Sequence, residues 1–171
     1  MASLMEELIQ TLDEEEKAYR ALIPVEEEKT RAVIANDLES LQDITDRERE
    51  LVDRSSALEG KREQIAADIA TVLGRNPQTI TVGEIIGVLK NQPKDQKALQ
   101  EIHDRLRTTV IRLQEINNQN RDLIKDSMEM IEYNMNVIRS TRMSSGSSNY
   151  SSNASEVAGM APQHGMFDAK Q

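Results

Sequence analysis

The chain has 171 residues and a net charge of −9, with no cysteine and only 2% aromatic residues. These values exclude disulfides and thiolate sites, and they predict a core built from aliphatic side chains, Met and Ala rather than from aromatic rings. The acidic balance is concentrated in residues 1–60, which hold 17 acidic and 7 basic side chains, and this argues against nucleic acid as a partner.

The first predicted helix covers residues 3–35. Ser3 and Glu6 fit a capping box at its start, and apolar residues then recur at helical spacing. Pro24 interrupts this pattern, because an internal proline removes a backbone hydrogen bond and clashes with the preceding turn. We expect a kink at Pro24; the alternative is that Pro24 is the first residue of a separate helix.

The second predicted helix covers residues 38–73. Asn36 can adopt the left-handed conformation that ends a helix, and Asp37 can cap the next one. Two long helices joined by so short a turn should form an antiparallel hairpin. The apolar stripe of this helix is expected to comprise Leu38, Leu41, Ile44, Leu51, Leu58, Ile65, Ile69 and Val72.

A short helix is predicted over residues 82–90, after Gly74 ends the second one. Thr81 and Glu84 match a second capping box. Asn91 and Gln92 then interrupt the helix, and Pro93 suits the first turn of the next one.

The last predicted helix covers residues 93–142 and contains no internal Gly or Pro. Its length is on the order of 70 Å, and its apolar residues recur at steps of three and four. Part of this stripe must face a partner helix within the chain, and part is available to another protein. The stripe comprises Leu99, Ile102, Leu106, Val110, Leu113, Ile116, Leu123, Ile124, Met128, Ile131, Met135 and Ile138.

The fold class predicted from these elements is all-α. We expect an elongated antiparallel helical bundle or coiled-coil hairpin over residues 1–142, with a long C-terminal helix. Residues 143–171 are rich in Ser, Gly and Asn and predict a flexible, disordered tail. Its end holds the only Phe, Phe167, either as part of a loose terminus or as a short docking motif.

No catalytic or cofactor-binding motif is present, and the sequence therefore predicts neither an enzyme nor a cofactor. A di-metal site in a helical bundle would need two Glu-x-x-His motifs, but Gln100 lies three residues before His103. His103 is interpreted as a surface residue of the long helix. The acidic residues are interpreted as a solvated face, with the steering of a basic partner as the alternative.

Two features of the long helix allow both a structural and a binding interpretation. Met128 and Met135 fill a core or form an adaptable contact surface, a use for which Met is well suited. Asn117 and Asn120 fall where the apolar stripe would continue. A buried Asn there would fix the register between helices; an exposed one would contact a partner.

The segment Leu113–Ile138 resembles the signature of the FlgN family of flagellar export chaperones. The pattern Asn-x-x-Asn-x-x-Leu-[Leu/Ile]-x-x-Ser-[Leu/Met] on the last helix of that family is similar to this chain at Asn117, Asn120, Leu123, Ile124, Ser127 and Met128. The Ala32–Leu41 turn and the Thr79–Ile86 segment resemble the corresponding parts of the family, in the same order.

This resemblance implies a cytoplasmic, non-enzymatic chaperone. Such proteins bind the C-terminal helical segments of hook-associated (hook–filament junction) proteins of the FlgK and FlgL type, prevent their premature assembly and deliver them to the type III export apparatus. The lack of a signal peptide and of an apolar run of about 18 residues agrees with a cytoplasmic protein without stable membrane insertion. The implied partner-binding residues are Asn117, Asn120, Leu123, Ile124, Ser127, Met128, Ile131, Met135 and Ile138.

Other functions stay open at this point. A structural coiled-coil scaffold without a client, in particular a homodimer, would bury the same stripe against itself. A metal-binding four-helix bundle is disfavoured by the lone His103. Within the export chaperones, the client could instead be the filament protein or the cap protein.

Overall fold

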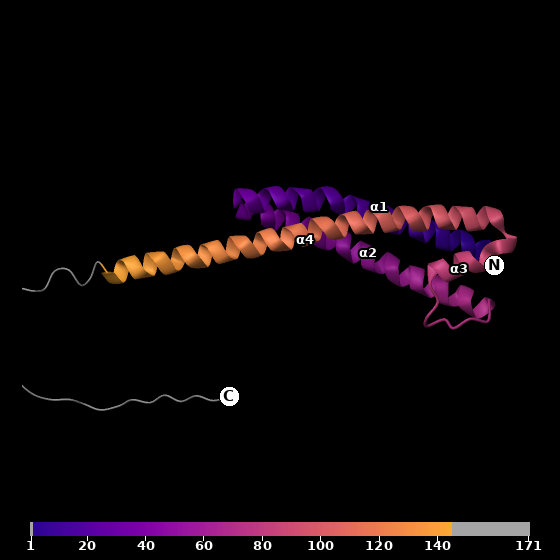
Figure 1. Cartoon of the computed structure of the whole chain (residues 1–171). Coiled ribbons are helices and arrows are strands. Elements are labelled where there is room, and N and C mark those ends of the chain that lie inside the picture. Colours follow the sequence, from indigo (N-terminus) through magenta and orange to yellow (C-terminus); the bar gives the residue numbers. More distant parts are fainter. Residues whose placement is uncertain (1, 145–171) are drawn as a thin grey trace, which may run out of the picture. The chain divides into compact units, whose positions relative to one another are not determined.

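The computed structural model describes residues 2–144, and in these residues the chain is all-α, as predicted (Figure 1). The chain divides into two units, Met1–Met130 and Ile131–Gln171. The last helix extends to Ser144 and so includes the first two residues of the predicted tail. The rest of that tail, with Phe167, lies outside the described residues.

Helices α1 (Ala2–Ala35) and α2 (Leu38–Val72) form the predicted hairpin. Asn36 has a φ of 57°, and the Asp37 amide donates to the Ala32 carbonyl at 2.9 Å, which is the bond that closes a Schellman motif. The Asp37 carboxylate then accepts from the Ser40 amide at 3.0 Å and caps α2. Both roles predicted for this turn are confirmed.

Gly74 ends α2 in the same way, with a φ of 66° and a 2.8 Å bond from the Arg75 amide to the Ala70 carbonyl. Helix α3 (Val82–Val88) opens with the predicted capping box of Thr81 and Glu84. A short 3-10 turn, η1 (Leu89–Asn91), follows, and α4 runs over Pro93–Ser144.

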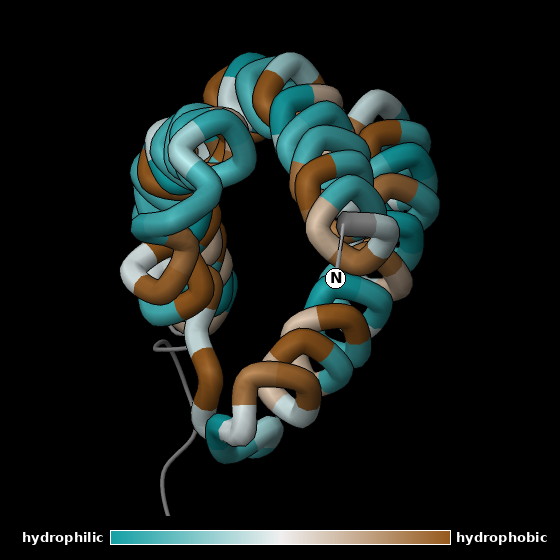
Figure 2. The backbone as a smooth tube through the Cα atoms, turned by 90° about the vertical axis from the view of Figure 1, so that its right-hand side faces the viewer, coloured by the Kyte–Doolittle hydropathy of each residue, from teal (hydrophilic) through white to brown (hydrophobic). Residues whose placement is uncertain are grey.

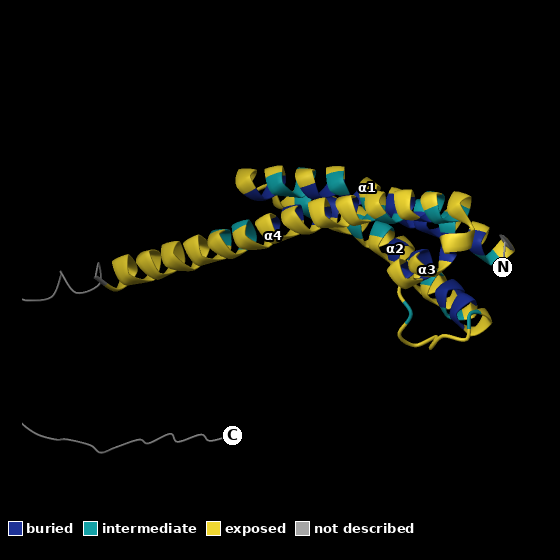
Figure 3. Ribbon diagram, turned by 45° about the vertical axis from the view of Figure 1, so that its right-hand side comes forward, coloured by how far each residue is buried: buried dark blue, intermediate teal, exposed yellow. Residues whose placement is uncertain are grey.

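The main core lies where the start of α1, the end of α2, α3 and the start of α4 meet (Figures 1 and 3). Helix α2 diverges from α1 toward this end, and α3 packs into the space between the elements. Because α3 is short, it depends on these long helices to bury its apolar face. The buried members are Met5, Leu8, Leu12, Ile65, Ala66, Ile69, Val82, Ile85, Ile86, Leu89, Leu99 and Ile102.

The apolar stripes differ in two helices from those that the spacing predicts. On α2, Leu38 and Val72 are exposed, while the middle of the stripe is buried or half-buried. On α4, Val110 is exposed and Thr109 takes the buried position. Each helix still carries hydrophobic residues at intervals between hydrophilic ones (Figure 2).

The cap expected at Ser3 is wrong, because α1 already includes Ala2 and Ser3. Met5 and Leu8 are buried in the main core, and this burial anchors the first turn without a capping side chain. Pro24 lies inside α1 rather than at the start of a separate helix.

Replacing Pro24 by Ala should stabilise the protein. The substitution restores a backbone donor inside α1 and removes a ring clash, so we expect the free energy of unfolding to rise by about 2 kcal/mol. Urea unfolding followed by circular dichroism measures the change. Pro93→Ala is the matched control, because a proline in the first turn of a helix costs little. Equal changes in the free energy of unfolding for the two substitutions would show that Pro24 does not destabilise α1.

Candidate functional site

The candidate site is the apolar face of α4 beyond Ile116. In the Met1–Met130 unit, Asn117 is exposed, Asn120 is buried, Leu123, Ile124 and Ser127 are half-buried, and Met128 is 65% exposed. In the Ile131–Gln171 unit, Ile131, Met135 and Ile138 are 54%, 47% and 49% exposed. Every described side chain of α4 from residue 128 to 143 is exposed (Figure 3).

The change from buried to exposed follows from the contact between α1 and α4. The two helices run parallel, because the residue numbers of the contacting pairs increase together along both helices, with an offset of 92 to 94 positions. The same offset puts Ala35, the last residue of α1, opposite about residue 128. The contact between α1 and α4 therefore ends near residue 128, although apolar residues continue to recur along α4 at helical spacing. The contacting pairs are Asp13 with Arg105, Glu16 with Thr109, and Glu26 with Asn120.

Asn120 is held inside this contact near its end. Its amide nitrogen donates to the Glu26 carbonyl at 2.9 Å and to the Glu26 carboxylate at 2.8 Å. Its amide oxygen accepts from the Thr30 hydroxyl. With only 2% of its surface exposed, Asn120 uses its amide to join α4 to α1, which is the register-fixing role of a buried Asn.

The Glu26 carboxyl group links Asn120 to α2. Burial raises the pKa of Glu26, and a hydrogen bond with the Glu48 carboxyl group raises it further. Burial alone would also raise the pKa of Glu48, but that hydrogen bond and the Lys29 ammonium, 2.7 Å from Glu48, lower it. Five polar side chains from three helices thus share one network: Glu26, Lys29, Thr30, Glu48 and Asn120.

A second cluster of buried polar side chains lies nearer the start of α1. Glu16 is fully buried and accepts from the Thr109 hydroxyl at 2.9 Å. Glu15 is also buried and is bonded by the Arg62 guanidinium at 3.0 Å; burial raises its pKa more than Arg62 lowers it.

The solvated face predicted for the acidic residues is therefore wrong at Glu15, Glu16 and Glu26, which face neighbouring helices. The available signal was a polar residue at an apolar step of the helical period. Thr109, the partner of Glu16, is an example, because it lies three residues after Leu106 and four before Leu113. A polar residue at such a step marks a buried contact that needs a partner. Composition alone could not identify these positions.

The described residues hold no group of three or more His, Asp or Glu side chains placed to bind a metal ion. His103 is half-buried and lies 3.4 Å from the Asp104 carboxylate. The face of α4 presents apolar side chains, and the polar side chains described above bond neighbouring helices to one another. The chemistry that this arrangement offers is helix packing.

The family model described as FlgN protein matches residues 1–158 of the chain. No curated protein and no solved structure matches it.

Asn120→Ala should destabilise the protein by about 2 kcal/mol, because it removes the amide that donates to the buried Glu26 carboxylate and joins α4 to α1. Asn117→Ala is the matched control: it removes the same amide from an exposed position three residues away, and its effect should stay within about 0.5 kcal/mol. Urea unfolding of the two variants measures the difference. Equal losses would contradict the role assigned to Asn120.

Proposed function

The chain belongs to the FlgN family of flagellar export chaperones, and we propose that it binds the C-terminal helical segments of hook-associated proteins of the FlgK and FlgL type. In this proposal the bound chaperone keeps the junction subunits from assembling early and delivers them to the type III export apparatus. The family is one of chaperones rather than enzymes.

The observation that carries the proposal is the exposed apolar row on α4. Ile124, Ile131 and Ile138 recur every seven residues, so they lie on one side of the helix. The first of them is half-buried, and the other two are about half exposed. Exposed apolar rows of this kind mark surfaces that another protein covers.

An amphipathic helix of the client can complete this row. Subunits intended for a polymer carry helices whose apolar sides are buried only after assembly, and covering such a side keeps the subunit from associating. Packing a helix against the row on α4 is a recurrent mode of peptide recognition, with anchors at helical spacing. The binding residues proposed are Leu123, Ile124, Ser127, Met128, Ile131, Met135 and Ile138.

The two asparagines of the motif take different parts in the proposal. Asn117 is exposed and stays available to the client, whereas Asn120 acts by holding α4 against α1. Met128 and Met135 suit a contact that must later be released, since Met side chains adapt to different partners without a rigid fit.

The setting proposed for this function is the cytoplasm, where export substrates are collected. No helix within residues 2–144 has the length and apolar character needed to span a membrane. A homodimer that buries the α4 row against a second copy is the competing use of the same surface. The oligomeric state therefore belongs in the test.

Ile131→Asp should weaken client binding. Calorimetric titration with C-terminal peptides of the junction, filament and cap proteins from the same genome measures it, with light scattering to give the mass before and after. We expect one-to-one binding of the junction peptides only, and at least about tenfold weaker binding by Ile131→Asp, because a carboxylate would have to enter an apolar contact.

Tyr133→Asp is the matched control, because Tyr133 is exposed and lies about 200° around the helix from Ile131. It should bind the junction peptides as the unchanged protein does. Preferential binding of the filament or cap peptides would assign a different client. A stable dimer that binds no peptide would favour the scaffold.

A further inference from the structure

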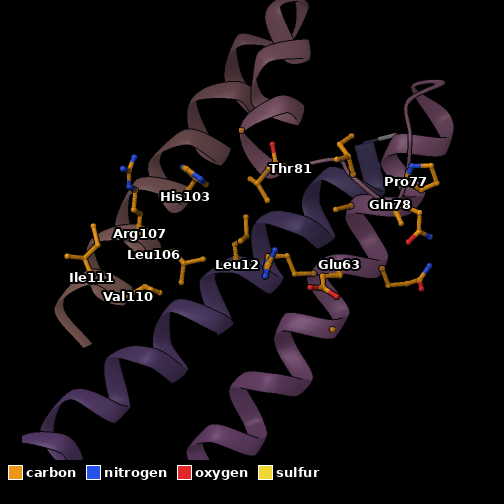
Figure 4. Close-up of a pocket in the computed structure, with 18 residues that line it drawn as sticks. Leu12, Glu63, Pro77, Gln78, Thr81, His103, Leu106, Arg107, Val110 and Ile111 are labelled. Carbon is orange, nitrogen blue, oxygen red and sulfur yellow. The ribbon is translucent and has the colours of Figure 1, made fainter. Parts of the chain in front are cut away.

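A groove of about 840 Å³ lies between α2 and α4 in the Met1–Met130 unit (Figure 4). Leu12 of α1 lies between its two walls, and Thr81 and the loop residues Pro77 and Gln78 lie at one end. The buried side chains of Leu12 and Ala66 contribute an apolar floor. The groove is thus bounded by helices on three sides.

The α4 wall carries apolar side chains that nothing in the described chain covers fully. Leu106, Val110 and Ile111 line the groove, and the last two are 38% and 48% exposed. Val110 was expected in the core from its spacing, but it lies on this wall instead. The wall therefore holds aliphatic surface in excess of what the fold buries.

Gly60 on the α2 wall is the second unusual feature. It lies inside a helix of 35 residues, where glycine costs about 1 kcal/mol relative to alanine. A Cβ atom built at Gly60 would meet no other atom within 4 Å, so packing within the chain does not require a glycine. A gap at this point of the wall gives room for a side chain from outside.

The walls also determine which kind of segment fits. All regular structure within residues 2–144 is helical, so the groove offers no strand edge with free backbone groups. An occupant must satisfy its own backbone hydrogen bonds once it is enclosed. An α-helix does this, and an extended peptide does not.

Opposite charges mark the two rims. Arg107 lies on α4 and Glu63 on α2 (Figure 4). Among the described residues neither side chain takes part in an ion pair or a hydrogen bond. By contrast, Arg62 beside them is paired with Glu15. A helix in the groove would meet a cation on one flank and an anion on the other.

We propose that the α2–α4 groove binds an amphipathic helix of a partner protein, with an aliphatic row toward Leu12 and Val110, an acidic flank toward Arg107 and a basic flank toward Glu63. A large aliphatic side chain of that helix occupies the space at Gly60. This site goes beyond the proposed function, because it uses none of the residues assigned to the client on α4.

The test uses a designed 18-residue helical peptide that carries a Leu row, Glu on one flank and Lys on the other. Fluorescence anisotropy follows its binding to the full chain in an Ile131→Asp background, so that the α4 row does not contribute. Gly60→Leu fills the groove and should weaken binding by at least about tenfold. Gly87→Leu is the matched control, since Gly87 also has an open Cβ position but does not line the groove; it should bind as its parent does.

Charge exchange provides the second readout. A peptide with Lys on both flanks should bind more weakly than the Glu/Lys peptide, and Arg107→Glu should restore its binding. Circular dichroism confirms that each variant keeps its helix content. Absence of saturable binding, or equal affinities for Gly60→Leu and Gly87→Leu, would overturn the proposal. Neither result bears on junction-peptide binding by the unchanged chain.

Discussion

The structure depends on a mismatch of length between two parallel helices. Helix α1 ends at Ala35, and the register of its contact with α4 puts this end opposite about residue 128. The apolar period of α4 nevertheless continues to Ile138. A helix that keeps its apolar period beyond its packing partner has a face that folding does not bury. The chain belongs to a family of export chaperones, and the binding surface that we propose for it is this uncovered part of the apolar stripe.

The polar groups between α1, α2 and α4 fix the register of α4 along α1, and therefore the residue at which α4 is no longer covered. Burying Glu16 and Glu26 is costly unless each has partners, and the structure supplies Thr109 to the first and Asn120 to the second. Aliphatic contacts alone would tolerate a shift of α4 along α1 by one turn. The hydrogen bonds from Asn120 do not tolerate such a shift, because it would leave buried oxygens unpaired. The network thus sets where the covered part of α4 ends.

Much of the fold follows from local rules that the sequence displays directly. The turn at Asn36–Asp37 and the capping box at Thr81 are short-range patterns, and the structure has both. The exposure of Val110 depends on which side of α4 faces a neighbour, and spacing alone does not give this. The α2–α4 groove arises from the divergence of α2 from α1, which no single segment encodes. The binding role of the α4 row was predicted from the family motif and stays a proposal.

Hydrogen–deuterium exchange along α4, with and without the C-terminal segment of a junction protein, tests the central claim most directly. Amide exchange reports local opening, and every α4 side chain described from residue 128 to 143 is exposed. We expect the segment to slow exchange over residues 128–140 and to leave the amides near Leu99 and Ile102 unchanged. Unchanged exchange over residues 128–140 under saturating segment would contradict the assignment of this face to the client.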